Sequence, residues 1–222
     1  MATYTVNVYG IFTPGSASGS NATQRRARLM ADVAAANRTW TIGGVSCINF
    51  VAAGTFTTGQ VIDASNFTFN EAFNGPITAV IDRIRTNFTG NRTGIYVVYT
   101  SGGYFRGGTG RTIGVGGVAI RDARSDTDYK IFGRVGLTNN ALNTYAFAHE
   151  AGHNLFATYV NSRLTSTDPS GPYINPQTGI RDPNHNNDRN NIMYPTVPNT
   201  NPIITNAQCQ KARSSKLVIT QG

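Results

Sequence analysis

The spacing of apolar and polar residues predicts a strand followed by a helix at the start of the chain. In the segment 3–12, Tyr4, Val6 and Val8 alternate in part with polar residues, which is typical of a strand. Residues 23–37 instead carry apolar and alanine side chains at helical spacing, with arginines on the other face. The two segments therefore predict a strand–helix unit.

This patterning continues to about residue 156 and then weakens. Residues 94–100 form a nearly continuous apolar run, which indicates a central strand covered on both faces. Pro76 is expected at the first position of a helix, whereas residues 54–75 are hard to assign and leave room for a short hairpin. Residues 160–202 are rich in proline and asparagine and show no periodicity. The expected strands are 3–12, 45–52, 94–100, 113–120 and 129–137, and the expected helices are 23–37, 76–87, 144–156 and 205–215.

This order of elements predicts an α+β fold within one domain, residues 1–222. The N-terminal subdomain, residues 1–157, is of the α/β type and ends in the helix 144–156. The C-terminal subdomain, residues 158–222, is irregular and closes with a final helix. A hydrophobic content of 39%, with 11 Phe and 10 Tyr, is enough to build a core for such a domain.

The segment 113–120, I-G-V-G-G-V-A-I, is a glycine-rich strand. Glycine in a strand often marks the close approach of another backbone. One interpretation is an edge strand that pairs with an extended peptide by strand addition. The other is a bulged strand or glycine-rich loop without a partner.

The helix at 144–156 carries the residues with the most specific chemistry. His149 and His153 are four positions apart, so their imidazoles share one face of a helix. Two neutral imidazoles on one face can hold a zinc ion, and Glu150 between them can take a proton from a zinc-bound water. The H-E-x-x-H motif has only three fixed positions, so a chance match has to be weighed against this interpretation.

Composition argues against chance. The chain has 3 His and only two Glu, and two of the His and one Glu fall within five consecutive residues. Without partners, a buried Glu and two buried His are costly, so a metal ion is their natural partner. The residues around the motif are apolar or aromatic rather than the Lys and Glu of a solvated face: Tyr145, Ala146, Phe147, Ala148, Leu155 and Phe156.

Charge and composition narrow the classes of partner and compartment. The formal net charge is +8, but the basic residues are scattered and no dense run is interleaved with aromatics, so we expect no nucleic-acid partner. A charged fraction of only 14%, with abundant Gly, Asn and Thr, suits an extracellular protein, and no apolar run reaches the length of a membrane span. The first ten residues lack the features of a signal peptide, so either the protein stays inside the cell or this is the mature portion of a secreted protein with an added Met. We expect the secreted form, and a monomer.

Two smaller features leave alternatives open. Cys47 and Cys209 either pair in an exported protein or remain two separate buried thiols. Asp122, Asp126 and Asp128 could bind Ca²⁺, but their spacing is not that of a calcium loop, and a solvated turn is the simpler interpretation.

A third zinc ligand is expected outside the helix, because catalytic zinc usually has three protein ligands and an open position. The remaining His is His185, in D-P-N-H-N-N-D-R-N-N-I-M-Y-P, eight residues before Met193. H-E-x-x-H, a further His and then I-M-Y-P resemble the metzincin clan of zinc metalloproteases. N-N-I-M-Y-P is similar to the matrixin form of the Met-turn, and A-H-E-A-G-H-N-L resembles the reprolysin-like helix. The resemblance is strong over residues 113–195 and only topological before them.

This resemblance implies a mixed, mostly parallel twisted sheet with an antiparallel edge strand, an active-site helix and a Met-turn. It implies one catalytic Zn²⁺ held by His149, His153 and His185, and hydrolysis of a protein or peptide substrate with Glu150 as general base. Met193 would form an apolar floor under the metal. Tyr194 either stabilises the oxyanion or packs, and residues 186–204 would wall the specificity pocket.

The chain departs from the clan at one point. The pattern H-E-x-x-H-x-x-G-x-x-H places a Gly and the third His where Phe156 and Tyr159 stand. We therefore expect an insertion, in which the helix runs on past Phe156, a loop of about 25 residues intervenes, and His185 returns as third ligand.

Other interpretations stay open. Asp168 could replace His185, which resembles the aspzincins, although their G-T-x-D-x-x-Y spacing is not matched. Tyr159 is a weaker third choice. For the whole chain, the alternatives to a zinc endopeptidase are a non-catalytic zinc module and an adhesin or toxin-type interaction module with an accidental motif. An intact Glu150 argues against the first of these, since a structural zinc site does not need it.

Overall fold

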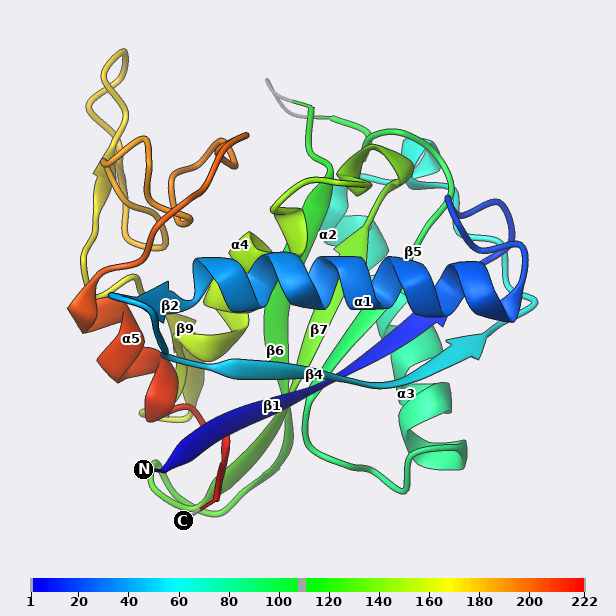
Figure 1. Cartoon of the computed structure of the whole chain (residues 1–222), viewed down its shortest axis with the longest axis horizontal. Helices are drawn as coiled ribbons and strands as arrows, with labels where there is room; N and C mark the ends of the chain where they lie inside the picture. Colours follow the sequence, from blue (N-terminus) through cyan, green and yellow to red (C-terminus); the bar gives the residue numbers. More distant parts are fainter. Residues whose placement is uncertain (1, 108–110, 222) are drawn as a thin grey trace.

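A twisted six-stranded sheet lies at the centre of the computed structural model, which describes residues 2–107 and 111–221 (Figure 1). Its strands run in the order β12-β1-β5-β7-β6, and β4 also pairs with β1. The pairs β1–β4, β1–β5 and β5–β7 are parallel, whereas β6 and β12 are antiparallel to their neighbours. This confirms the predicted α+β fold. The strands are β1 (Thr3–Phe12), β4 (Asn49–Thr57), β5 (Ile95–Tyr99), β6 (Gly114–Ala123), β7 (Tyr129–Leu137) and β12 (Ile219–Gln221).

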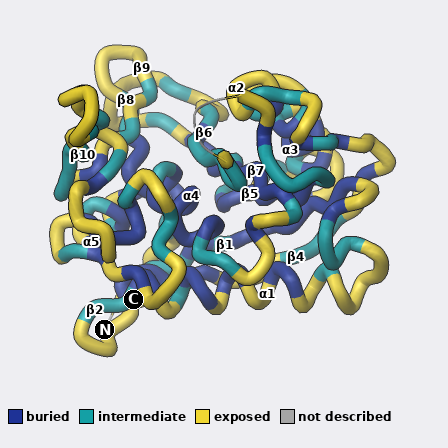
Figure 2. The backbone as a smooth tube through the Cα atoms, turned by 90° about the horizontal axis from the view of Figure 1, so that it is seen from above, coloured by how far each residue is buried: buried dark blue, intermediate teal, exposed yellow. Residues whose placement is uncertain are grey.

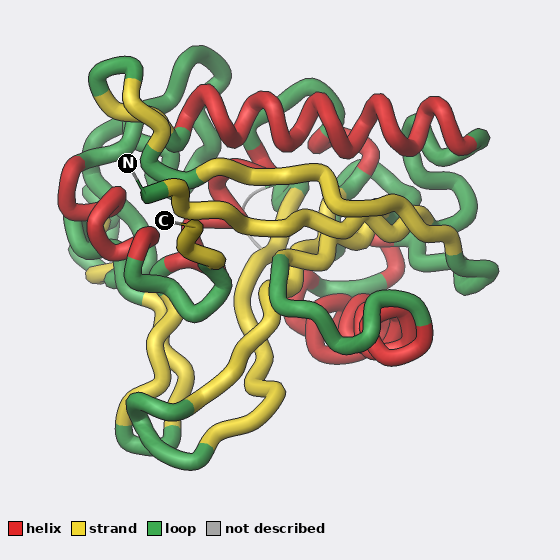
Figure 3. Tube along the Cα trace, turned by 60° about the horizontal axis from the view of Figure 1, so that its bottom comes forward, coloured by secondary structure: helices red, strands yellow, loops and turns green. Residues whose placement is uncertain are grey.

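Helices cover both faces of the sheet, which is the middle of three layers (Figure 3). On one face lie α1 (Ala22–Thr39) and α4 (Ala146–Leu155), which contact each other as well as the strands. On the other face lies α3 (Thr78–Asn87). Buried and exposed residues alternate along α1, because one side of the helix packs on the core and the other faces solvent (Figure 2). The residue patterns at 3–12 and 23–37 thus correspond to the first strand and the helix that covers it.

The central strand β5 shows how the two cores divide. Ile95, Val97 and Tyr99 point into the core under α1 and α4, whereas Tyr96 and Val98 point into the core under α3. All five side chains are buried. The expectation of a strand covered on both faces is confirmed, because an apolar run without alternation can be buried only when both faces are packed.

None of the helices in the described part of the chain is long and apolar enough to cross a membrane.

The remaining segments of the chain form short elements. The small hairpins are β2 (Thr41–Ile42) with β3 (Val45–Ser46), β8 (Ala157–Val160) with β9 (Arg163–Ser166), and β10 (Tyr173–Ile174) with β11 (Arg181–Asp182), and the short helices are η1 (Ala64–Asn66), α2 (Phe69–Ala72), η2 (Phe73–Ile77), η3 (Asn139–Ala141) and α5 (Asn206–Arg213).

The helix expected to begin at Pro76 starts earlier, so that prediction is wrong. Thr68 and Glu71 form a reciprocal capping box, and α2 begins directly after Thr68. Pro76 lies inside the π-helical segment η2, whose distortion at Gly75 (φ −114°, ψ −107°) accommodates it. Residues 54–75, all of which the structure describes, hold no hairpin. The capping box of Thr68 and Glu71 marks the true start of this helical region, whereas Pro76 lies inside it.

Two further boundaries differ from the expectation. The strand expected at 45–52 is split between β3 and a longer β4. The helix with the H-E-x-x-H motif does not run on past Phe156: α4 ends at Leu155, and Ala157 already begins β8. The inserted residues turn back at once as a hairpin because Ala157–Val160 pair with Arg163–Ser166. The division into subdomains 1–157 and 158–222 stays a prediction.

A disulfide joins distant parts of the chain. Cys47 and Cys209 are bonded, with Cα atoms 5.6 Å apart and a sequence separation of 162. Cys47 lies between β3 and β4, and Cys209 is buried on α5. The bond therefore ties the last helix to the core beneath α1, and resolves the alternative of two separate thiols.

We predict that replacing both cysteines by serine lowers the free energy of unfolding by about 2–4 kcal/mol, because the unfolded chain is no longer constrained. Urea unfolding monitored by tryptophan fluorescence measures the loss. Reduced wild-type protein should unfold at the same midpoint as the double variant. A double variant as stable as the oxidised wild type would contradict the prediction.

Candidate metal centre

Three histidines meet at one point of the structure. His149 and His153 lie one turn apart on α4, and His185 enters from the loop that follows β11. One potential ligand atom from each lies within 4.8 Å of the others. The structure thus brings together two residues of the motif and the one distant histidine, which lies 32 positions after His153 in the sequence.

The outer ring nitrogens are held by acceptors, which leaves the inner ones free. Nδ1 of His149 lies 2.6 Å from the carbonyl oxygen of Ile192, and Nδ1 of His185 lies 2.7 Å from Oδ2 of Asp182. A carbonyl or carboxylate oxygen accepts, so each Nδ1 donates its proton outward. The Nε2 atoms of His149 and His153 lie 3.2 Å apart on the inner side. Such outward hydrogen bonds are usual for histidines that bind a metal.

Burial keeps the two helical histidines neutral. Desolvation, assisted by the nearby His185, lowers the pKa of His149 to about 4. Desolvation, together with the charges that His149 and His185 would carry, lowers the pKa of His153 well below its ordinary value. Neutral imidazole is the form that binds metal, so at neutral pH the pair needs no deprotonation step.

Glu150 lies buried against the glycine-rich strand. Burial raises the pKa of its carboxyl to about 8. A side chain on Gly114 would come within 2.7 Å of Oε1 of Glu150, and one on Gly116 within 2.8 Å of Oε2. These two glycines therefore leave the space that the carboxyl group fills. The close approach expected from the glycines is real, but α4 and the side chain of Glu150 make it.

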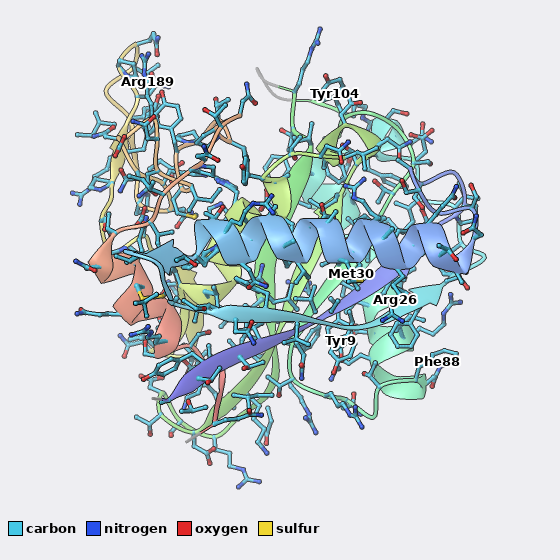
Figure 4. The ribbon with its side chains drawn as sticks, in the orientation of Figure 1. Tyr9, Arg26, Met30, Phe88, Tyr104 and Arg189 are labelled. Carbon is cyan, nitrogen blue, oxygen red and sulfur yellow. A yellow bond between two sulfur atoms is a disulfide. The ribbon has the colours of Figure 1, made fainter. Side chains whose placement is uncertain are left out.

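β6 is also an edge strand among the described residues, since it pairs with β7 alone. It lines a cleft of about 740 Å³ together with the three histidines and Glu150. Thr196, Val197 and Asn199 line the cleft on the C-terminal side, within the segment 186–204 expected to wall it. In the view of Figure 4, Arg189 marks the C-terminal part and Tyr104 the segment that leads toward β6.

Met193 is buried against α4. A methyl group on Gly152 of α4 would clash with its sulfur atom, so the turn and the helix are in direct contact. The amide of Met193 donates to the side chain of Asn191 at 2.9 Å, and its carbonyl accepts from the amide of Asn186 at 2.8 Å. Met193 thus packs against the helix that carries His149 and His153, and its role as an apolar floor under a metal stays a prediction.

Tyr194 packs away from the cleft. Its ring meets that of Tyr173 edge-on, with centroids 5.6 Å apart. Tyr194 is not among the residues that line the cleft. Of the two expected roles, this geometry favours packing, and a role in stabilising an oxyanion stays a prediction.

Asp168, the competing ligand, is occupied elsewhere. Its carboxylate accepts two hydrogen bonds from Nε2 of Gln208, at 3.0 and 2.9 Å, and one from the amide of Ser170 at 2.8 Å. Gln208 also exchanges hydrogen bonds with the side chain of Asn191. The group of potential metal ligands does not include Asp168. This residue instead joins the insertion, the Met193 turn and α5.

Tyr159, the weakest alternative, is also used elsewhere. It lies on β8, and its ring packs against Tyr129 with centroids 5.6 Å apart. The tip of this hairpin is held by the amide of Asn161, which donates to Asp126 of the β6–β7 turn at 2.9 Å. At its base, Ser166 donates to the carbonyl oxygen of His153 at 2.8 Å. The hairpin thus reverses the chain directly after α4.

The three aspartates that left a calcium site as an alternative have other partners. Asp122 and Asp128 pair with Arg124, and Asp126 caps the neighbouring hairpin. None of the three belongs to a group of potential metal ligands among the described residues. They form the solvated turn that was the simpler interpretation.

The three imidazoles fit a metal ion by their chemistry. They offer three nitrogen donors at the floor of an open cleft, which is the ligand set of many catalytic metal sites. Two of them are neutral through burial, and two have outer hydrogen bonds that set the ring orientation. The group can therefore hold a metal ion.

Sequence reasoning missed Asp182 and the buried pair Gln208 and Asn191. The signal for Asp182 was its position three residues before His185. Gln208 and Asn191 gave no signal, because their partners lie far away in sequence.

Comparison with known proteins adds information on the fold. No family model matches the sequence, and no curated protein matches it. Metalloproteinase-II from Bacteroides fragilis is similar in structure, with a TM-score of 0.53 and 14% identity, over 96% of this chain and 54% of that one. A structure of a chaperone–substrate complex matches with a TM-score of 0.45 and 18% identity, over 78% of this chain and 26% of that one. The chain thus spans about half of the metalloproteinase and about a quarter of the other chain. The likeness to the metalloproteinase shows a shared fold.

We predict that Gly116→Ala destabilises the protein by about 1–3 kcal/mol, because the new methyl group would lie 2.7 Å from the backbone oxygen of Glu150. Chemical denaturation measures the change. Gly59→Ala is the control, since a methyl group there meets nothing within 4 Å. Equal stability of the two variants would contradict the tight packing of α4 on β6.

Proposed function

We propose that this chain is a secreted zinc-dependent endopeptidase of the metzincin type. The observation that carries the proposal is the convergence of His149, His153 and His185 beside the buried Glu150 on the floor of a cleft. The fold shared with metalloproteinase-II from Bacteroides fragilis and the sequence around Met193 support the same assignment. The disulfide between Cys47 and Cys209 is compatible with an oxidising, extracellular location.

In this proposal the inner nitrogens of the three histidines hold one zinc ion. When bound, zinc supplies a Lewis acid that polarises a peptide carbonyl and acidifies water. The donor set is entirely nitrogen, which suits zinc better than Ca²⁺ or Mg²⁺, whose preferred ligands are oxygen atoms.

Glu150 acts as the general base. Its carboxyl group takes the proton of the attacking water and delivers it to the departing amine of the substrate. Burial alone raises the pKa of Glu150 to about 8 and so favours the protonated carboxyl. The positive charge of a bound zinc ion would lower this pKa and favour the carboxylate, which is the form that accepts a proton. The pocket between Gly114 and Gly116 keeps the group at one place.

The edge of β6 orients the substrate. A protein or peptide in extended form can add as a further strand along this edge, so that its backbone lies beside Glu150 and the histidines. Backbone hydrogen bonds then supply affinity that does not depend on the substrate's sequence. Selectivity for substrate side chains comes from the opposite wall of the cleft, which includes Val197 and Asn199. The protein acts as a monomer in this proposal.

We predict that Glu150→Gln lowers peptide cleavage by at least about 100-fold while zinc stays bound, because glutamine keeps the shape but cannot accept the proton. Cleavage of a peptide library, read by mass spectrometry with and without a chelator, measures activity, and elemental analysis measures zinc. Wild-type cleavage should stop with the chelator and return when zinc is restored. Activity that survives in the variant would overturn the role of Glu150. Zinc binding without any cleavage by the wild type would favour a non-catalytic zinc module.

We predict that His185→Ala loses stoichiometric zinc, whereas Asp168→Ala keeps it. Removing Asp168 should instead lower stability by about 1–3 kcal/mol, since the buried Nε2 of Gln208 loses one of its two acceptor side chains. Zinc content per folded protein and urea unfolding separate the two effects. If His185→Ala keeps full zinc and activity and a folded Asp168→Ala loses both, the third ligand is Asp168.

A further inference from the structure

The loop that delivers His185 contains an aspartate with two separate contacts. Asp182 ends β11, three residues before His185. Its Oδ1 accepts the amide of Asn184 at 2.9 Å, which closes a tight turn. Its Oδ2 lies 2.7 Å from Nδ1 of His185. One carboxylate thus shapes the turn and contacts the imidazole that the turn carries.

This turn is fixed at both ends. Before it, Asp182 pairs with Tyr173 across the β10–β11 hairpin, and the carbonyl oxygen of Pro183 accepts the amide of Asp168 at 3.0 Å. After it, the amide of Asn186 donates to the carbonyl oxygen of Met193 at 2.8 Å. The backbone position of His185 is therefore set by its neighbours, and Asp182 is left to set the orientation and proton position of the ring.

The outer contacts of the histidines differ in kind. His149 meets a neutral backbone carbonyl, that of Ile192, whereas His185 meets a charged side chain. Both oxygens accept a hydrogen bond from Nδ1–H and leave Nε2 as the nitrogen with the lone pair. A carboxylate does so more strongly and also makes the ring a better donor to a metal.

We propose that Asp182 is a positioning residue for the metal centre. It holds His185 in the tautomer whose Nε2 faces His149 and His153, and it thereby strengthens metal binding. This inference rests on the metal site of the proposed function, but not on peptide hydrolysis, so it can be tested by metal binding alone.

The isosteric change Asp182→Asn separates shape from charge. In the variant, the side-chain oxygen has to accept the amide of Asn184, because an NH₂ group there would face another donor. The NH₂ group then points at Nδ1 of His185 and forces that nitrogen to accept. The proton moves to Nε2, where it opposes a metal ion.

The experiment measures zinc affinity by competition with a fluorescent chelator, using the whole chain. We expect Asp182→Asn to bind zinc about 10–100-fold more weakly than wild type. Asp188→Asn is the matched control with unchanged affinity, since Asp188 closes a similar turn in the same loop through Asn190. Asp182→Ser keeps an oxygen for the turn but does not reach the imidazole, so it should also weaken binding.

A second measurement reports the proton directly. The ¹⁵N chemical shifts of His185 in the metal-free protein should show the proton on Nδ1 in wild type and on Nε2 in Asp182→Asn. Wild-type affinity and an unchanged tautomer in Asp182→Asn would overturn the inference while leaving the metal centre intact. Wild-type affinity in His185→Ala, or no zinc binding by wild type, would overturn both this inference and the metal site.

Discussion

The contact between α4 and β6 is the constraint on which the centre depends. Glu150 is buried beside two strand positions that tolerate no side chain, Gly114 and Gly116. This close approach fixes the height of the helix above the sheet, and the helix in turn fixes His149 and His153. Within the described residues, the edge of β6 that no strand covers lines the same cleft as this carboxyl group. Packing, electrostatics and access to the cleft are therefore set by one helix–strand contact.

The C-terminal part of the chain has few regular elements and is held by polar side chains instead. Asp168, Gln208 and Asn191 are buried and hydrogen-bonded to one another. Gln208 lies on α5, next to Cys209, so the disulfide and the network hold the same helix. A fully satisfied buried network favours one arrangement, because each group that loses its partner stays desolvated. The result is a loop region with a defined shape beneath the third histidine.

Local patterns were enough to predict most of the fold and part of the centre. Alternation and apolar runs identified β1, α1, β5 and β7, because these elements are buried on defined faces. The motif spacing identified His149, Glu150 and His153, since helix geometry alone brings them together. The predicted end of α4 was wrong because a hairpin follows the helix at once. The pairing of Ala157–Val160 depends on residues later in the chain, Arg163–Ser166. The hydrogen bonds between Asp168 and Gln208 join residues 40 positions apart, so no local sequence pattern predicts them.

The long path between His153 and His185 has a modest thermodynamic cost. His185 lies 32 residues beyond His153, whereas the pattern H-E-x-x-H-x-x-G-x-x-H has its third His six residues beyond the second, so the loop is about five times longer, which costs about 1.5 kcal/mol of closure entropy if the loop is flexible. The insertion is not flexible along its length: the β8–β9 hairpin, the contact of Asp168 and the turn at Asp182 each fix a part of it. A single buried hydrogen bond contributes about 1 kcal/mol, so these contacts together offset the added length. A metal centre requires only that its ligand atoms converge, and a chain can therefore reroute between ligands wherever such local anchors hold the longer path.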